Sequence, residues 1–158
     1  RDLRMSRGLG DVYKRQPYFR LRPSIHPATY TDIYARSLYA AEDGDMNKLE
    51  QKLIVELTAL PNVRWWHRNI ARQDFAINGF IKHYPDILIM TKSGKLICAE
   101  TKGEHLKNDD SREKITLGQA WRTAAGKDFR YYMVFENEEN LLPGAVSMSQ
   151  FIDTVKAL

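Results

Sequence analysis

The chain has 158 residues and a formal net charge of +4, with 43% hydrophobic and 28% charged residues, which is the usual balance of a globular domain. Its single cysteine, Cys98, excludes an internal disulfide and a cysteine-cluster metal site, and it favours a reducing, cytoplasmic setting. No apolar run approaches the length of a membrane span, so no membrane partner is expected.

Residues 1–16 hold five basic and two acidic side chains, which is +3 of the +4, so the rest of the chain is nearly neutral. This segment lacks sustained periodicity and resembles a translated sequencing adaptor, so we expect it to be non-native and the native protein to begin further upstream. The alternative is a native basic tail that binds nucleic acid. Residues 17–44 are expected to form a lead-in segment with a helix over 28–41.

A second helix is predicted over 46–60, with Asp45 as its N-cap and Pro61 just beyond it. Five apolar side chains recur at helical spacing, namely Met46, Leu49, Leu53, Leu57 and Leu60. Glu50 falls inside this apolar stripe, where a carboxylate needs a partner. Two interpretations stay open: Glu50 completes an acidic site as a third carboxylate, or it lies at the margin of the core and pairs with an arginine or lysine.

Short strands are predicted over 62–70 and 74–80, and Asn78-Gly79 is a strong hairpin turn signal. Trp65 and Trp66 face opposite sides of the first of these strands. For both rings, core packing is favoured over contact with DNA bases.

The runs 84–90 and 95–103 are typical of two antiparallel strands joined by a short polar turn. Asp86 lies near the start of the first strand, and Glu100 and Lys102 lie near the end of the second. Pairing across the turn brings these ends together, so two carboxylates and an ammonium group are expected at one corner. Carboxylate oxygens suit Mg²⁺, and the lysine could hold or activate a water for attack on a phosphate.

A helix is predicted over 112–125 with Gly126 as its C-terminal stop, followed by a strand over 129–135 and a terminal helix over 147–157. The expected buried side of the first of these helices consists of Leu117, Trp121, Ala124 and Ala125. The candidates for contact with DNA phosphates are Lys114, Gln119 and Arg122. The alternative for these three residues is an ordinary solvated helix face.

The predicted order is helix, about three antiparallel strands, helix, strand and helix, which is an α/β (α+β) arrangement of the form αβββαβ with a mixed central sheet flanked by helices. With Asp86 and Glu100-Thr101-Lys102 on the middle hairpin, this order resembles the PD-(D/E)xK nuclease superfamily, whose restriction-endonuclease-like core would span 45–158. Over about 28–158, the chain is also similar to the C-terminal endonuclease domain of Type III restriction enzyme Res subunits. The similar blocks are 47–50, 61–69, 75–79, 84–86, 100–103, 114–121 and 132–135.

The resemblance implies that Asp86, Glu100 and the Thr101 carbonyl bind Mg²⁺, that Glu50 completes the site, and that Lys102 positions or activates the attacking water. The reaction would be hydrolysis of a phosphodiester in double-stranded DNA. The family's helicase motor, with its ATP site, would lie upstream, and a methyltransferase subunit would read the target sequence. The chain is therefore expected to be a C-terminal cutting module that is site-specific only with its partner subunits.

Three alternatives stay open. The first is a repair-type or exonuclease-like nuclease of the same fold, which would prefer free DNA ends. The second is a noncatalytic nucleic-acid-binding or assembly domain that keeps the fold and shows no Mg²⁺-dependent nicking. The third is an unrelated α/β domain in which the acidic hairpin arose by chance.

Overall fold

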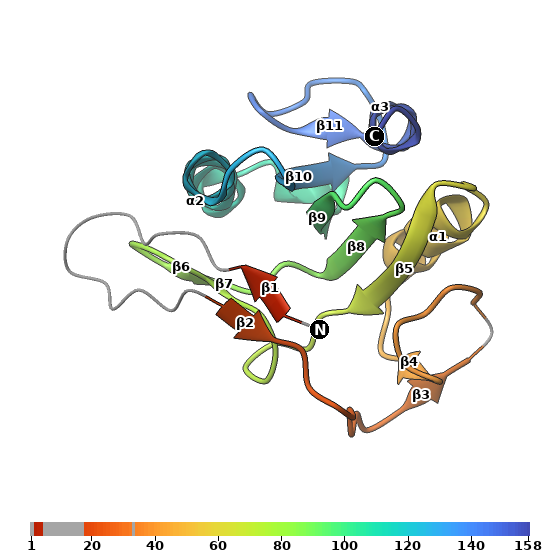
Figure 1. Cartoon of the computed structure of the whole chain (residues 1–158). Coiled ribbons are helices and arrows are strands. Elements are labelled where there is room, and N and C mark those ends of the chain that lie inside the picture. Colours follow the sequence, from red (N-terminus) through yellow and green to blue (C-terminus); the bar gives the residue numbers. More distant parts are fainter. Residues whose placement is uncertain (1, 5–17, 33) are drawn as a thin grey trace.

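A computed structural model describes residues 2–4, 18–32 and 34–158. Its main feature is a five-stranded mixed sheet with the strand order β11-β10-β9-β8-β5 (Figure 1). The strands of this sheet are β5 (Val63–Arg68), β8 (Ile87–Thr91), β9 (Leu96–Lys102), β10 (Phe129–Phe135) and β11 (Val146–Ser147). β8 is antiparallel to β5 and to β9, and β10 is parallel to β9 and to β11.

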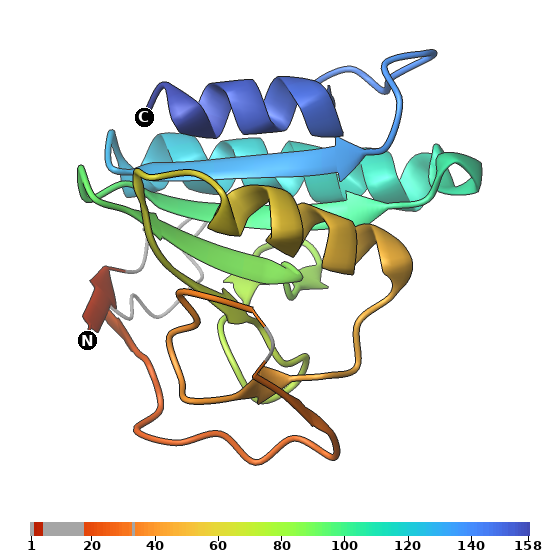
Figure 2. The same cartoon turned by 90° about the vertical axis from the view of Figure 1, so that its right-hand side faces the viewer.

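Three helices cover the two faces of the sheet, so the molecule has three layers (Figures 1 and 2). α2 (Asp109–Ala125) lies on one face, and α1 (Lys48–Thr58) and α3 (Met148–Lys156) lie on the other. The predicted fold class, a mixed sheet flanked by helices, is confirmed at this level. The smaller elements are β1 (Asp2–Arg4), β2 (Tyr18–Arg20), β3 (Tyr30–Thr31), β4 (Glu42–Asp43), β6 (Ile77–Asn78), β7 (Lys82–His83) and a 3₁₀ turn, η1 (Glu104–Leu106).

Side chains alternate between two separate cores on opposite faces of the sheet. Trp65 packs on the α2 side with Leu88, and Trp66 packs on the α1 and α3 side with Ile87. Both tryptophans are at most 4% exposed, so the prediction that they serve as core residues is confirmed.

Local capping explains where the helices begin. α1 starts later than predicted because Asn47, and not Asp45, is its N-cap; the Asn47 side chain accepts a hydrogen bond from the Glu50 N–H, and the Glu50 carboxylate accepts one from the Asn47 N–H. α2 starts earlier than predicted because Asn108 caps it. Gly126 ends α2 with a φ of 105°, as expected for a glycine stop.

The buried side of α2 differs in part from the prediction. Leu117 and Trp121 are buried as expected, but Ala124 is exposed and Ala125 is only partly buried. Ile115 is buried instead. The buried side of the helix is therefore centred on Ile115, Leu117 and Trp121, and Ala125 packs only at its margin.

The prediction of a helix over 28–41 is wrong. Among the described residues of this range there is no helix; β3 pairs with β4 instead, and Arg36 has a left-handed φ of 63°. The segment lies along the free edge of β5, where the Trp66 ring donates a hydrogen bond to the Ala35 carbonyl (2.8 Å) and the Leu38 N–H donates one to the Trp66 carbonyl (2.8 Å). Covering an exposed sheet edge outweighs the modest helical pattern of the segment.

The prediction that residues 1–16 are non-native concerns a segment of which only 2–4 are described, so most of it lies outside the described residues. Within the described residues, no helix has the length and apolar character needed to cross a membrane.

Candidate active site

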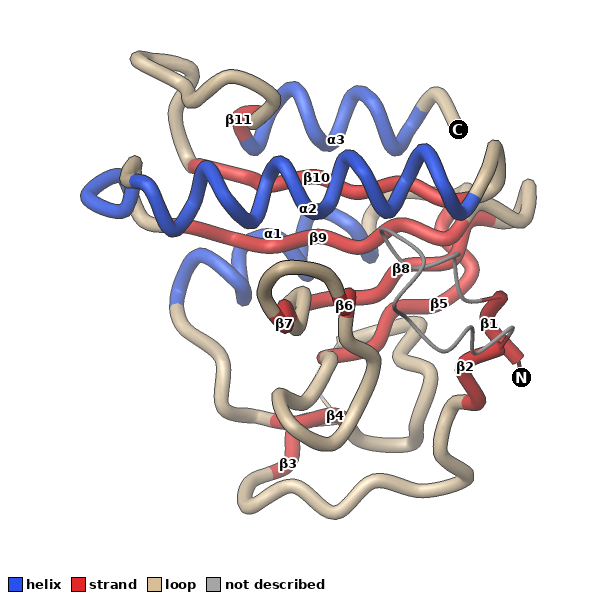
Figure 3. Tube along the Cα trace, turned by 90° about the vertical axis from the view of Figure 1, so that its left-hand side faces the viewer, coloured by secondary structure: helices blue, strands red, loops and turns tan. Residues whose placement is uncertain are grey.

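The two predicted carboxylates lie on adjacent strands at one end of the sheet. In the register of β8 and β9, Ile87 pairs with Ala99, so Asp86 lies one step further, directly opposite Glu100. Directly opposed residues of antiparallel strands share a face and have Cβ atoms about 4.5–5.5 Å apart. The expectation that Asp86 and Glu100 meet at one corner of the hairpin is therefore confirmed. Figure 3 shows this end of the sheet, where β9 passes into the loop that leads to α2.

Asp86 is held in one orientation by its neighbour on β9. Its Oδ2 atom accepts hydrogen bonds from the backbone N–H of Thr101 (2.8 Å) and from the Thr101 hydroxyl (3.1 Å). The Asp86 carbonyl is also held, because it accepts from the Asn69 N–H (2.9 Å) and from Arg68 Nη1 (2.8 Å). The carboxylate is therefore positioned before any ligand arrives.

Glu100 is buried, with its Oε1 atom 3.3 Å from Lys102 Nζ. Its Oε2 atom is also buried and has no hydrogen-bond partner among the described residues. Burial, and then the charge of Asp86, raise the pKa of Glu100 to about 8. A buried carboxylate oxygen without a partner needs an explanation, and a role in binding a cation would provide one.

Glu50 reaches the same corner from α1, although it comes from the opposite face of the sheet. Its Oε1 atom lies 3.2 Å from Arg68 Nη2, and burial followed by the charge of Asp86 raises its pKa. Glu50 therefore pairs with an arginine, as the second interpretation has it, and it also lies close enough to Asp86 for the two charges to interact. Its place in the first turn of α1 is set by the capping box with Asn47.

Arg68 is the site residue that the sequence analysis missed. It connects the two acids, since Nη2 is 3.2 Å from Glu50 and Nη1 is 3.6 Å from Asp86 Oδ1. A sequence signal was available: Arg68 ends β5 two residues after Trp66 and therefore shares the α1 side of the strand. What the sequence could not indicate was that α1 brings a carboxylate to that point.

The three predicted DNA contacts lie along α2 but at different distances from the corner. Lys114 lies beside it and pairs with Asp110 (2.9 Å). Burial lowers the pKa of Lys114, but the hydrogen bond to Asp110 and the charge of Glu100 outweigh burial and raise it overall. Gln119 is partly buried and Arg122 is exposed. At about 1.5 Å per residue, Arg122 lies roughly 12 Å further along the helix than Lys114.

The corner can bind a divalent cation through two carboxylate ligands. The described residues contain no group of three or more His, Cys, Asp or Glu side chains arranged to hold a metal ion, so Glu50 is not a third direct partner in this conformation. Asp86 and Glu100 supply hard oxygen atoms, and Glu100 Oε2 is free of other partners among the described residues. Mg²⁺ commonly uses one or two carboxylates and keeps several waters, so this set suits it.

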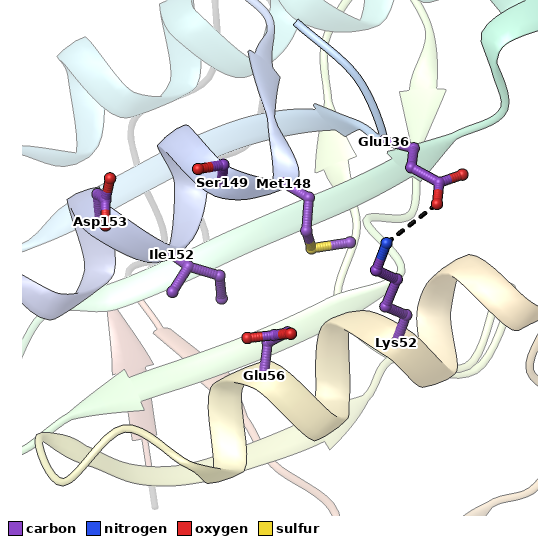
Figure 4. Close-up of a pocket in the computed structure, with 7 residues that line it drawn as sticks. All are labelled: Lys52, Glu56, Glu136, Met148, Ser149, Ile152 and Asp153. Atoms are coloured by element: carbon purple, nitrogen blue, oxygen red, sulfur yellow. Dashed lines mark hydrogen bonds and ion pairs between the residues drawn. The ribbon is translucent and has the colours of Figure 1, made fainter.

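A separate cavity of about 330 Å³ lies between α1 and α3, on the other side of the sheet from α2 (Figure 4). Its lining includes three carboxylates, Glu56, Glu136 and Asp153, and one lysine, Lys52, which is paired with Glu136 (3.0 Å). None of the predicted site residues lines it. An acidic lining repels phosphate, so we do not assign this cavity to nucleic acid.

Comparison with protein-family models, curated proteins and solved structures finds no match for this chain. Its function is therefore inferred from geometry and chemistry.

Proposed function

We propose that this chain is a Mg²⁺-dependent DNA endonuclease module with a restriction-endonuclease-like core. The observation that carries the proposal is the opposition of Asp86 and Glu100 on adjacent strands, with Lys102 next to Glu100. A divalent cation would relieve the repulsion between the two carboxylates and would give the buried Glu100 oxygen the partner it lacks among the described residues.

The roles within the site follow from these contacts. Asp86 and Glu100 would hold the ion with the Thr101 carbonyl as a further ligand, and Glu50 would act beside them through its charge. The ion would supply electrostatic stabilisation of the phosphate oxygens during hydrolysis. Lys102 would bind and orient the attacking water, because its ammonium group is kept at the corner by Glu100. Thr101 keeps the Asp86 carboxylate in place through two hydrogen bonds.

The order of elements supports the same assignment. α1, β5, β8, β9, α2 and β10 follow one another as αβββαβ, with the small β6 and β7 pair inserted between β5 and β8. In this proposal the chain acts on double-stranded DNA in the cytoplasm, with a methyltransferase subunit that reads the target and an ATP-driven motor that lies upstream. Lys114 would contact the DNA phosphate nearest the corner, and Gln119 and Arg122 would continue the contact along α2.

The test is nicking of supercoiled plasmid by the whole chain in Mg²⁺ or Mn²⁺. Asp86→Asn and Lys102→Ala are expected to lower the rate at least 100-fold, because charge stabilisation and a positioned base or water each contribute about that much. The matched control is Lys95→Ala, at the other end of β9, whose ion pair with Asp128 (2.8 Å) is far from the corner. This control is expected to cut like the unaltered chain.

Folding of each variant is checked by circular dichroism and urea unfolding. Nicking that survives in both corner variants would refute the proposal, whereas strong preference for linear over circular DNA would favour an exonuclease-like enzyme. DNA binding without metal-dependent nicking, in the chain and in its complex with a motor and a methyltransferase subunit, would favour the noncatalytic alternative.

A further inference from the structure

The Arg68 side chain lies where two carboxylates from different elements come together. Its Nη2 atom is 3.2 Å from Glu50 of α1, and its Nη1 atom is 3.6 Å from the carboxylate of Asp86, just before β8. The Arg68 side chain is only 16% exposed, so water screens these pairs weakly. The guanidinium therefore lies between the two acids as a shared positive charge.

The hydrogen bonding of Arg68 is incomplete. Nη1 donates to the carbonyls of Asp86 (2.8 Å) and Asn69 (3.2 Å), but Nε is buried and has no partner among the described residues. The ion pair with Asp86 is also longer than that with Glu50. A permanently optimised arginine would use its planar fork on a carboxylate with two parallel bonds, and this one does not. The guanidinium is therefore anchored by two backbone carbonyls and binds the Asp86 carboxylate only loosely.

We propose that Arg68 is an internal counter-cation, which holds Glu50 and Asp86 together and competes with a divalent cation for the Asp86 carboxylate. This inference rests on the proposed function and adds regulation of the same site. Arg68 is thereby a positioning residue, since it acts through Glu50 and Asp86.

Two consequences follow from the charges. In the absence of an ion, Arg68 lowers the repulsion between Glu50 and Asp86, so the corner stays folded without metal. When an ion binds, it must either displace the guanidinium or share the Asp86 carboxylate with a positive charge, and both weaken binding. Arg68 would therefore set the ion concentration at which the site fills, and the site would stay empty of ions at lower concentrations.

A purely structural role for Arg68 makes a different prediction. If the residue only ties α1 to the end of β5, its removal lowers stability and leaves the affinity for cations unchanged or weaker. The two roles are therefore separated by binding measurements on the folded protein.

The experiment measures Mn²⁺ binding by isothermal titration calorimetry on the whole chain, together with urea unfolding in a chelator. The variants are Arg68→Met and Arg68→Lys, and the matched control is Arg64→Met, an exposed arginine on the same strand. Arg68→Met is expected to bind Mn²⁺ at least tenfold more tightly than the unaltered chain and to unfold at lower urea without metal. Arg68→Lys, which keeps the charge, is expected to bind within about threefold of the unaltered chain. Arg64→Met is expected to change neither property.

The outcomes distinguish this inference from the proposed function. Equal or weaker Mn²⁺ binding by Arg68→Met, with binding lost in Asp86→Asn, would overturn the role of Arg68 and leave the metal site standing. No Mn²⁺ binding by any form, Arg68→Met included, would overturn the metal site itself. If Arg68→Met fails to fold, Arg68→Gln provides the same comparison with a polar side chain of smaller size.

Discussion

The Asp86 carboxylate accepts two hydrogen bonds from Thr101 on the neighbouring strand, one from the backbone N–H at 2.8 Å and one from the hydroxyl at 3.1 Å. Both go to Oδ2, and Oδ1 is left on the side of Arg68. The hairpin thus fixes which oxygen of Asp86 is available to a ligand. The Thr101 carbonyl stays a predicted metal ligand, and the structure shows in addition that the Thr101 N–H and hydroxyl donate to Asp86.

Removing the Thr101 hydroxyl should loosen Asp86. Thr101→Val keeps the shape and the N–H bond but loses the hydroxyl bond, so we expect a loss of about 1.5 kcal/mol in the free energy of unfolding, the size of a hydrogen bond to a charged group. Thr101→Ser keeps the hydroxyl and should lose less than the valine variant. Urea unfolding checks both variants. A valine variant more stable than the serine variant would show that packing of the methyl group, and not the hydroxyl hydrogen bond, determines the stability.

The titration of Glu100 should report its surroundings. Burial, and then the charge of Asp86, raise its pKa to about 8, so the carboxyl group is mostly protonated at neutral pH without an ion. Asp86→Asn should lower this pKa, because it removes the neighbouring negative charge. Carbon-13 NMR of the labelled carboxyl group measures both values. A titration near the ordinary glutamate pKa in the unaltered chain would contradict the buried geometry.

His67 lies between two carboxylates in the interior. Its Nδ1 atom is 2.7 Å from Glu42 and its Nε2 atom is 2.9 Å from Asp74, and all three side chains are almost fully buried. Burial alone would lower the pKa of His67, but the hydrogen bonds to Asp74 and Glu42 outweigh it and raise the pKa above its ordinary value. Arg22 pairs with Asp74 at 2.9 Å, so this cluster ties the lead-in segment to β5.

Stability should therefore fall as His67 loses its proton. Because its folded pKa is raised, its contribution is complete below the unfolded pKa of about 6.5 and is lost as pH rises through the folded value. Glu100 also has a raised pKa and lowers stability over an overlapping range, so the measurement is made in the Glu100→Gln background. There, urea midpoints should fall from pH 6 to pH 9 relative to those of the matched His67→Gln variant, because the pKa of His83, lowered to about 3 by burial, makes both forms gain stability as the unfolded chain deprotonates near pH 6.5.

The matched variant for this prediction is His67→Gln, again with Glu100→Gln. We expect it to lose about 3–5 kcal/mol at pH 6, because a buried charge network loses its central cation, and to lack the fall at higher pH. Nitrogen-15 NMR of the ring gives a second measurement. A His67 ring that is singly protonated at pH 6 would contradict the prediction.

Gly118 allows α2 to approach the sheet. A Cβ atom at this position would lie 2.2 Å from Cδ1 of Tyr131, whose ring is fully buried and whose hydroxyl is 2.8 Å from His83 Nε2. Gly118→Ala should therefore destabilise the protein by about 2 kcal/mol or more, since overpacking exceeds the gain of roughly 1 kcal/mol in helix propensity. Thermal unfolding measures this. The control is Ala124→Ser on the exposed turn, and a Gly118→Ala variant as stable as this control would show that the ring can move.

Most of the secondary structure followed from local patterns, because strand alternation and helical spacing act over neighbouring residues. Alternation fixed which side chains share a face within each strand, and the short turn between the two strands set the register that brings Asp86 opposite Glu100. The helix over 28–41 failed for the opposite reason: its residues bond to Trp66 and to β4, which no local pattern reveals.

The remaining contacts of the corner depend on elements that are distant in the chain. Glu50 and Arg68 lie on a helix and a strand, and Glu42 reaches His67 across 25 positions, so no spacing rule relates them. The sequence shows each of these charged residues, but it does not show which residue each one pairs with. The position of Glu50 on an apolar helix stripe indicates that its carboxylate needs a positively charged partner. Only the packing of α1 against the end of β5 determines that this partner is Arg68.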